Sequence, residues 1–344
     1  MRGVKLNKSN TNHHNDQAFI PMKIISTGVS LPPNKIESSS IDIRLNKPNG
    51  YTLKRSGIEH RFHADKNQSQ IDLAVEAINN ALEAKNIDAE SIDLLICASA
   101  IPHQALPYTA AHILKASKLR NGLSCFDINA SCVSFIVALH TAACLINSNC
   151  YSRIAIVSSE LASRGLNWDD EESSLIFGDG SACAIIEKGD GRSGILSYLL
   201  ETYSEGLDLC QIKAGGTNRN IKTEMHDSDF MFKMQGKPLF KISSLLIEPF
   251  FSKLIESSGF SLSEIKTIVP HQASHLSLMH MRKRLNISED ALIDIYKFRG
   301  NQIAASVPTA LHAAFSMNRV QPNEPTMLIG TAAGLSFAGM VFLP

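Results

Sequence analysis

The chain has 344 residues, of which 44% are hydrophobic and 19% are charged. This length exceeds the ~250–300 residues at which a single hydrophobic core stops growing, so two domains or one large duplicated core are expected. The 33 basic and 33 acidic residues balance, which excludes a global field that attracts nucleic acid or an anionic membrane, so a charged partner must be bound by a local patch.

The cysteines and the N-terminal residues indicate the compartment. The seven cysteines follow no CxxC or metal-binding spacing and lie mostly in apolar segments, which is typical of a reducing environment. Residues 1–21 are polar and lack the apolar core of a signal peptide, and no later apolar run approaches the ~18 residues of a membrane span. We therefore expect a cytoplasmic protein with no membrane partner and a disordered tail over residues 1–21.

Strand-like and helix-like segments alternate along the rest of the chain, which favours an α/β fold. Residues 22–32 (MKIISTGVSLP) predict a strand, residues 71–87 an amphipathic helix and residues 91–100 (SIDLLICASA) a buried strand. The series continues with a helix in YTAAHILKASKL, a strand in LSCFDI, a buried helix in VSFIVALHTAACLI and a strand in RIAIVSSE. Glycines in IFGDGSACAIIEK predict a tight bend followed by another strand.

Two segments of the first half have counterparts in the second. IDAESIDLLICAS (87–99) resembles FSLSEIKTIVPHQAS (260–274), and GDGSACAIIE (178–187) resembles AAGLSFAGMVF (332–342), in the same order. Self-similarity of this kind indicates duplication. It predicts two similar α/β halves, residues 22–190 and 191–344, packed face to face. Loops at the carboxyl ends of the strands would then meet at the junction, where ligand sites tend to form.

Cys132 stands between a predicted strand and a predicted helix, in DINASCVSFIVALH (127–140). The unpaired N–H groups and the positive dipole end of a helix favour thiolate over thiol, so one interpretation is a nucleophile. The other is a small buried hydrophobe, which is the usual role of a free cysteine in an apolar stretch. Position alone favours the second interpretation.

The second half offers partners for a nucleophilic Cys132 on comparable loops. His271 directly follows a strand in VPHQASHLSL, and Asn301 precedes the small residues that open a helix in RGNQIAASVPTAL. Cysteine, histidine and asparagine form a recognised nucleophilic group, in which imidazole raises the thiolate content and donors hold a developing oxyanion. Taken singly, His271 is also compatible with a capping or core role and Asn301 with a turn.

Four motifs in the same order resemble the β-ketoacyl-acyl-carrier-protein synthase III family of the thiolase fold. They are DINASCVSF, IFGDGSACAII, VPHQAS and GNQIAASVPTAL, and the resemblance runs from Met22 to Pro344. It implies an α/β, thiolase-like fold with two duplicated halves in a five-layered αβαβα core. The nucleophilic cysteine would belong to residues 22–190, and the histidine and asparagine to residues 191–344.

The resemblance implies a decarboxylative Claisen condensation. Cys132 would take an acyl primer from coenzyme A or acyl carrier protein, and the backbone N–H groups of Cys132 and of the loop near Gly334 would hold the oxyanion. His271 and Asn301 would donate hydrogen bonds to the thioester oxygen of malonyl-acyl-carrier-protein as carbon dioxide leaves. The resemblance further implies no metal or redox cofactor and a homodimer with LSCFDINASC near its interface.

Other positions match the family in roles with ordinary alternatives. Tyr51 and Arg55 match residues that grip the nucleotide end of coenzyme A, although a solvated loop would look the same. Lys283 and Arg284 match basic positions that bind acyl carrier protein, although a solvated helix face is the default interpretation. Phe177 is expected to shape the bend beside the active site; the GDG that follows lacks the lysine and Ser/Thr of a phosphate loop.

Some departures from the family concern substrate choice. Glu171 stands where an arginine usually helps to hold coenzyme A, and Leu276 where an arginine often meets the carrier protein. Leu106 stands where a larger aromatic residue often closes the acyl pocket, so a longer or branched primer is expected to fit. Gln302 replaces a common threonine. These differences leave open a specialised relative that takes its acyl group from a carrier protein.

Two other catalytic classes stay open on the sequence. One is an acyltransferase of the same fold that forms an ester or amide from acyl-Cys132 without making a carbon–carbon bond. The other is a hydrolase of the Cys-His-Asn type, which the surrounding thiolase-like motifs disfavour. A non-catalytic partner subunit is also disfavoured, because such subunits commonly lose the nucleophile.

Overall fold

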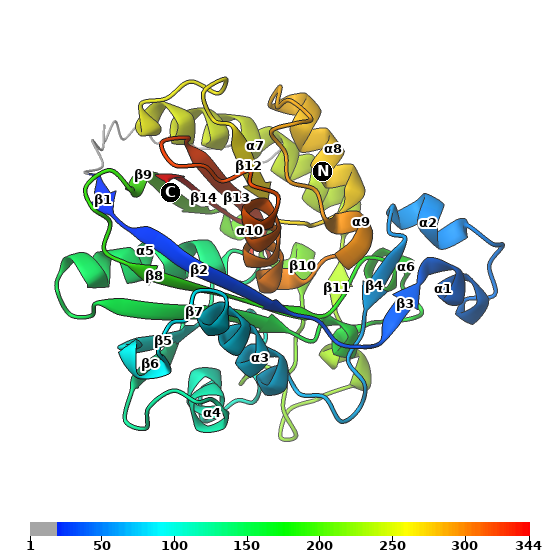
Figure 1. The fold of residues 1–344 in the computed structure, drawn as a ribbon. Coiled ribbons are helices and arrows are strands. Elements are labelled where there is room, and N and C mark those ends of the chain that lie inside the picture. Colours follow the sequence, from blue (N-terminus) through cyan, green and yellow to red (C-terminus); the bar gives the residue numbers. More distant parts are fainter. Residues whose placement is uncertain (1–18) are drawn as a thin grey trace.

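The structure is a computed structural model that describes residues 19–344, and two five-stranded sheets form its centre (Figure 1). The first has the order β2 (Lys23–Ser30), β8 (Gly180–Glu187), β7 (Arg153–Glu160), β5 (Leu94–Cys97) and β6 (Ser124–Asp127). The second has the order β1 (Ile20–Pro21), β9 (Gly194–Thr202), β14 (Ser336–Leu343), β13 (Thr326–Ala332) and β12 (Thr267–Pro270).

The two sheets share one pairing pattern. In the first, β5 runs parallel to β7, which pairs antiparallel with β8; in the second, β12 runs parallel to β13, which pairs antiparallel with β14. The echoed segments of the sequence contain the equivalent strands, β5 with β12 and β8 with β14. The predicted duplicated α/β architecture is confirmed. The division expected after residue 190 falls in the turn between β8 and β9.

Helices complete five layers, α on β on α on β on α (Figure 1). Helices α3 (Gln70–Glu83) and α4 (Thr109–Ala116) cover the outer face of the first sheet. Helices α5 (Ser134–Asn147) and α10 (Ser306–Ser316) lie between the sheets. Helices α7 (Gly236–Ser258) and α8 (His275–Arg284) belong to the far side of the second sheet.

Alternation along the strands explains this layering. Successive side chains of a strand point to opposite faces of its sheet. In β5, Leu94 and Ile96 join the central core with α5 and α10, whereas Leu95 and Cys97 join the outer core with α3. Because both faces are buried, the strand reads as a continuous apolar run, which is typical of a sheet covered on both sides.

The N-terminal boundary differs from the expectation. The predicted tail ends at residue 21, but Ile20 and Pro21 form β1 and pair antiparallel with Ile195 and Gly194 of β9. The start of the first half therefore supplies an edge strand to the sheet of the second half. Residues 1–18 of the expected tail lie outside the described residues. Within residues 19–344 no helix combines the length and apolar character needed to cross a membrane.

Helix α3 packs unusually closely on β2. The sequence predicts a helix over residues 71–87, and α3 begins at Gln70 after a capping box in which Ser69 and Asp72 exchange hydrogen bonds with each other's backbone. It ends at Glu83, because residues 84–87 turn back toward the preceding turn of the helix. The contact with β2 is made at Gly28, where the backbone of α3 touches the strand.

Replacing Gly28 with alanine is expected to lower the free energy of unfolding by about 1–3 kcal/mol, the usual cost of overpacking a core. A Cβ atom there would lie 2.3 Å from the nitrogen of Ala81 and 2.4 Å from the oxygen of Ala77, and helix backbone cannot yield as a flexible side chain can. Chemical denaturation measures the change. Gly216→Ala is the control, because its Cβ would meet no atom within 4 Å; equal stability of the two variants would contradict the close packing.

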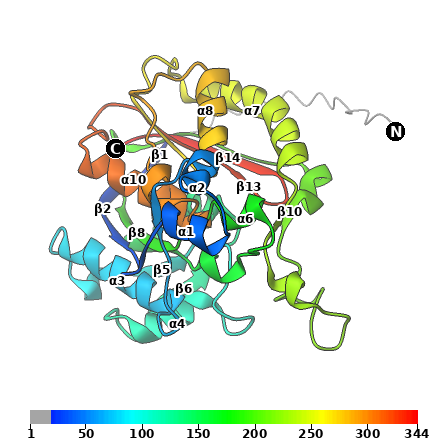
Figure 2. The same ribbon diagram turned by 90° about the vertical axis from the view of Figure 1, so that its right-hand side faces the viewer.

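Short elements gather at one end of the two sheets, on the right of Figure 1 and facing the viewer in Figure 2. They are α1 (Ser38–Arg44), α2 (Tyr51–Ser56), α6 (Glu171–Ser174), α9 (Tyr296–Arg299) and the strand pairs β3 (Lys35–Glu37) with β4 (His60–Phe62) and β10 (Cys210–Gln211) with β11 (Lys233–Met234). The described residues also form short 3-10 turns: Ala162–Gly165, Ser204–Leu209, Asp227–Phe230, Ile303–Ala305 and, before the amino end of β5, Ala89–Ser91.

Candidate active site

A pocket of about 780 Å³ lies where elements of the two halves meet, and Cys132, His271 and Asn301 all line it. The first comes from the loop between β6 and α5, the second from the loop after β12, and the third from the loop before α10. The structure therefore brings together the three residues that the sequence singles out. Side chains of α7 and α8 and the loop between β13 and β14 form much of the remaining wall.

A tight turn presents Cys132 two residues before α5 begins. The hydroxyl of the fully buried Ser134 donates to the carbonyl of Ser131 at 2.6 Å and accepts from the N–H of Ala130 at 2.9 Å. Ser131 has a φ of 53°, a left-handed conformation that reverses the chain just before the cysteine. Cys132 is thus held at the junction between strand and helix that the sequence predicts.

The surroundings of the Cys132 sulfur are mostly apolar. The residue is half-buried and packs in a cluster with Phe177, Phe232 and Ile303. Burial raises the pKa of the thiol, and the neighbouring thiol of Cys210 raises it further, against the lowering effect of the backbone N–H groups of Ala333 and Cys132 itself. The expectation that the helix end favours thiolate is wrong, because desolvation outweighs those N–H groups.

His271 is fixed by the second sheet. Its backbone N–H donates to the carbonyl of Ile329 at 2.8 Å, which continues the pairing of β12 with β13 past the last strand residue. The residue is 7% exposed. Burial lowers the pKa of the imidazole to about 4, so the ring is neutral at neutral pH.

Asn301 joins the two halves through its backbone. Its N–H donates to the carbonyl of Ile176 at 2.7 Å, and its carbonyl accepts from the N–H of Gly178 at 3.1 Å. The side-chain Oδ1 accepts from the N–H of Ile303 at 2.8 Å, which sets the orientation of the carboxamide. Its Nδ2 donates to the carbonyl of Ala273 at 3.2 Å, so one of the two amide hydrogens is not used by that bond.

His271 and Asn301 contact each other within this framework. Nε2 of His271 lies 3.3 Å from Oδ1 of Asn301. A carboxamide oxygen only accepts, so this contact is a hydrogen bond only when the imidazole hydrogen is on Nε2. The amide then has one unused N–H, and the ring N–H can reach the same developing oxyanion by turning away from or sharing its bond to Asn301 Oδ1, so the pair is suited to a single oxyanion.

We expect the imidazole of His271 to stay neutral from pH 8 down to about pH 5, because its folded-state pKa is about 4. The unfolded chain binds this proton near pH 6.5, so His271 lowers the stability of the folded protein as the pH falls from about 6.5 to about 4, by up to about 3 kcal/mol at about 1.4 kcal/mol per pKa unit. Denaturation of the native chain and of His271→Gln across this range measures the difference. Equal pH dependence of the two would contradict a buried neutral ring.

The remaining predicted residues fall into two groups. Phe177 and Arg55 line the pocket, and the ring of Phe177 meets that of Phe232 edge to face at 4.6 Å. Lys283, at the end of α8, also lines it. Tyr51 and Arg284 are outside its lining: the Tyr51 hydroxyl donates to Glu171 at 2.5 Å, and the Arg284 guanidinium pairs with Glu248 at 2.8 Å.

Two expectations are corrected. Leu106 is 84% exposed and is absent from the pocket lining, so within this chain it does not bound an acyl site. Gly334 is also absent from the lining, and the backbone N–H beside the Cys132 sulfur is that of Ala333. Gly334 and Leu335 have φ values of 87° and 45°, so this tight turn moves the donor one residue earlier than the glycine suggested.

Sequence reasoning missed several residues of the site. Cys210, Phe232 and Met234 line the pocket from β10, β11 and their surroundings, a region in which none of the motifs falls. Glu160 is outside the pocket lining but close enough to influence the Cys132 pKa; it ends β7 fully buried, its Oε1 accepts from the N–H of Ala100 at 2.5 Å, and burial raises the pKa of its carboxyl to about 8. The sequence feature that could have indicated Glu160 is the acidic residue at the end of the apolar run RIAIVSSE.

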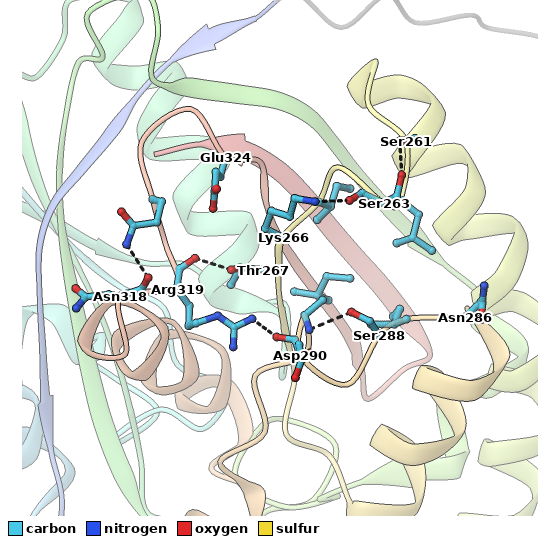
Figure 3. A pocket seen from close by; sticks show the side chains of 16 residues that line it. Ser261, Ser263, Lys266, Thr267, Asn286, Ser288, Asp290, Asn318, Arg319 and Glu324 are labelled. Atoms are coloured by element: carbon cyan, nitrogen blue, oxygen red, sulfur yellow. Dashed lines mark hydrogen bonds between the residues drawn. The ribbon is translucent and has the colours of Figure 1, made fainter.

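A second cavity, of about 760 Å³, lies beside the start of β12 and has no cysteine or histidine in its lining (Figure 3). Both of its cations serve the local fold: the Lys266 ammonium donates to the carbonyl of Ser263 at 2.9 Å, and the Arg319 guanidinium to the carbonyl of Asp290. Among residues 19–344 no group of three His, Cys, Asp or Glu side chains is placed to hold a metal ion. The pocket around Cys132 therefore remains the candidate active site.

Known proteins resemble this chain over nearly its whole length. A family model described as 3-oxoacyl-[acyl-carrier-protein] synthase III matches residues 126–204, and the model of that family's C-terminal part matches residues 255–343. β-Ketoacyl-[acyl-carrier-protein] synthase III from Neisseria meningitidis is 28% identical over 319 residues, covering 93% of this chain and 98% of the relative. The enzyme of that name from Syntrophomonas wolfei is 29% identical over 322 residues, covering 93% and 96%.

Solved structures agree with the sequence comparison. The crystal structure of 3-oxoacyl-[acyl-carrier-protein] synthase III from Aquifex aeolicus superposes with a TM-score of 0.84 at 26% identity, covering 94% of this chain and all of that one. A synthase III from Thermus thermophilus gives a TM-score of 0.85 at 25% identity, covering 93% and 98%. The fold is thiolase-like, and the chain is similar over nearly its whole length to the 3-oxoacyl-[acyl-carrier-protein] synthase III family.

Proposed function

We propose that the protein is a condensing acyltransferase that joins an acyl primer, carried on Cys132, to malonyl-acyl-carrier-protein. The observation that carries the proposal is the meeting of Cys132, His271 and Asn301 on one pocket, from loops far apart in the sequence. The relatives bear the name of this activity. In this proposal residues 22–190 supply the nucleophile, and residues 191–344 supply the histidine and asparagine.

The first half-reaction loads the primer. The Cys132 sulfur attacks the carbonyl carbon of an acyl thioester, the old carbon–sulfur bond breaks, and the Cys132 proton leaves with the departing thiol. The raised pKa of Cys132 means that the thiol must lose its proton during the reaction rather than before it. The N–H groups of Cys132 and Ala333 beside the sulfur are suited to hold the oxyanion formed on the way.

The second half-reaction uses His271 and Asn301. The thioester oxygen of the malonyl group accepts from His271 Nε2 and Asn301 Nδ2, which stabilises the enolate when carbon dioxide leaves. The enolate carbon then attacks the acyl carbon on Cys132, and the Cys132 sulfur leaves and regains a proton. A neutral imidazole, which keeps its Nε2 hydrogen throughout, suits this role because it donates without transferring a full charge. Neither half-reaction calls for a metal or a redox cofactor.

The partners follow from the same proposal. Lys283, on the pocket lining, and Arg284 beside it would meet the acidic surface of acyl carrier protein. We also propose a homodimer formed at the free edge of β6, the last strand of the first sheet. Leu106 and Tyr108, at 84% and 46% exposure, belong to the segment that precedes α4 beside this edge and would be covered in such a dimer.

The test is an incubation of the protein with acyl thioesters and malonyl-acyl-carrier-protein, followed by measurement of carbon dioxide and of the acyl products. Release of carbon dioxide coupled to a β-ketoacyl product longer by two carbons is the expected result. Transfer of the acyl group to an alcohol or amine without carbon dioxide release would instead identify an ester- or amide-forming acyltransferase. Hydrolysis of a peptide or simple ester would identify a hydrolase.

A further inference from the structure

A bridge of three partly exposed side chains lies at the edge of the Cys132 pocket and reaches its lining through Glu171. Glu171, in the first turn of α6, lines the pocket and has a half-exposed side chain. Its Oε2 accepts from the hydroxyl of Tyr51 at 2.5 Å, and its Oε1 pairs with the ammonium of Lys47 at 2.8 Å. The Lys47 ammonium also lies 5.0 Å from the centre of the Tyr51 ring. The bridge ties α6 to α2 and to the loop that precedes it.

Within this bridge the Lys47 ammonium and the Tyr51 side chain bind Glu171, so they are not available to bind a ligand. The hydrogen bonds from Lys47 and Tyr51 lower the pKa of Glu171, so the carboxylate is ionised at neutral pH. The positive charge of Lys47 is neutralised within the bridge, and the Tyr51 hydroxyl is occupied by its bond to the carboxylate. Glu172, the next residue, also lines the pocket and accepts from the N–H of Gly236 at 3.0 Å. This side of the opening is therefore carboxylate-rich.

The other cations on the pocket lining are Arg55, Lys237 and Lys283. Within residues 19–344 these three make no hydrogen bond or ion pair at contact distance, although Arg55 lies close enough to Glu171 to lower the pKa of its carboxyl. Cations of this kind suit the single phosphate of a phosphopantetheine arm. A coenzyme A thioester would have to place a second phosphate, an adenosine and a 3′-phosphate at the same side, where Glu171 neutralises the Lys47 cation and Glu172 adds a further carboxylate.

We propose that Glu171 is a specificity-determining residue that disfavours the nucleotide of coenzyme A, so that the acyl primer reaches Cys132 on the phosphopantetheine arm of a carrier protein. The inference rests on the proposed acylation of Cys132 and names the carrier of the primer. The thioester and the pantetheine are identical in both carriers. The inference therefore concerns only the nucleotide of coenzyme A and the protein of the acyl carrier protein.

The experiment compares three donors of one acyl group: acyl-carrier protein, acyl-phosphopantetheine and acyl-coenzyme A. The rate of acylation of Cys132 is followed by intact-protein mass spectrometry, and kcat/KM is obtained for each donor. We expect acyl-phosphopantetheine to react at least as well as acyl-coenzyme A, because the nucleotide finds no favourable contact, and acyl-carrier protein to react best. A value for acyl-coenzyme A about tenfold above that for acyl-phosphopantetheine, which corresponds to about 1.4 kcal/mol of nucleotide binding, would overturn the inference.

Charge reversal at Glu171 tests the residue itself. Glu171→Arg releases Lys47 and Tyr51 and adds a cation, so kcat/KM for acyl-coenzyme A is expected to rise about tenfold relative to acyl-phosphopantetheine, and the gain is expected to shrink at high salt. The matched control is Glu37→Gln, which removes a carboxylate paired with Lys35 at 2.8 Å, away from the pocket lining. An unchanged donor ratio in Glu171→Arg, or an equal change in the control, would show that Glu171 does not select the donor.

The outcomes separate this inference from the proposed function. If Cys132 is acylated, but fastest by acyl-coenzyme A, the condensing role stands and the inference about Glu171 fails. If no donor acylates Cys132, both fail together. Thermal unfolding of Glu171→Arg checks the fold of the variant, and Glu171→Gln, which keeps a side-chain oxygen for Tyr51 but loses the charge, is expected to give a smaller shift in the same direction.

Discussion

Replacing Cys132 with alanine is expected to abolish acylation and to lower kcat for condensation by about 10⁴- to 10⁶-fold, the range seen when a nucleophile is removed from an enzyme. Among Cys132, His271 and Asn301, only Cys132 carries a thiol. The other two side chains have no hydroxyl or amine that could replace it as the nucleophile. Catalysed decarboxylation of malonyl-acyl-carrier-protein without condensation is expected to survive in this variant, because His271 and Asn301 are intact.

Cys210 provides the sharpest control for this prediction. It lines the same pocket as Cys132 and its thiol lies near enough to influence the Cys132 pKa. Cys210→Ala is expected to keep acylation within about threefold, well below the roughly tenfold that 1.4 kcal/mol of barrier would cause. Loss of acylation in Cys210→Ala together with retention in Cys132→Ala would show that the nucleophile is Cys210 and not Cys132.

The second large effect is expected at Asn301. Asn301→Asp keeps an oxygen that accepts from the Ile303 N–H but removes both Nδ2 hydrogens. Decarboxylation is expected to fall by about 10²- to 10³-fold, the typical cost of losing one oxyanion donor. Acylation of Cys132 does not use this donor and is expected to change less than about threefold, a difference of under 1 kcal/mol in barrier.

Separate assays of the two half-reactions measure this contrast. Radiolabelled carbon dioxide reports decarboxylation, and the mass of the intact protein reports acylation. Thermal unfolding of Asn301→Asp shows whether the backbone clamp to Ile176 and Gly178 survives. A variant that folds normally but loses both half-reactions equally would contradict the division of labour between Cys132 and the His271–Asn301 pair.

Much of the site was predictable because its residues occupy the ends of strands. Cys132 follows β6, and His271 follows β12, each in a short motif that ends an apolar run. The repeated order of segments indicated that these strands belong to two similar sheets, whose carboxyl ends meet. Local patterns indicated where these loops lie, because strand direction and duplication fix their place. The assignment of Cys132 as the nucleophile came from the resemblance to the family.

The protonation of the site was less predictable. Whether Cys132 is a thiolate depends on the balance between helix-end N–H groups and desolvation. The desolvation comes partly from Phe232, and the Cys210 thiol raises the pKa further; both residues are 78 or more positions away along the chain and carry no motif. The residues that neighbour Cys132 in the sequence indicate the helix-end N–H groups, but they do not indicate the desolvation.

The errors at Leu106 and Gly334 have the same origin. Both positions were assigned from the resemblance to the family, yet the orientation of a side chain or N–H depends on the turn around it. The loop after β13 reverses through Gly334 and Leu335, which puts the Ala333 N–H beside the sulfur. Leu106 is 84% exposed and outside the pocket lining of its own chain.

The most direct measurement is peptide-level mass spectrometry on protein that is first loaded with an acyl thioester and then mixed with malonyl-acyl-carrier-protein. We expect the mass of the acyl group to be found on the peptide that contains Cys132. We expect it to disappear at the rate at which carbon dioxide and the lengthened product form. An acyl mass on any other peptide, or one on Cys132 that persists while product accumulates, would contradict this account.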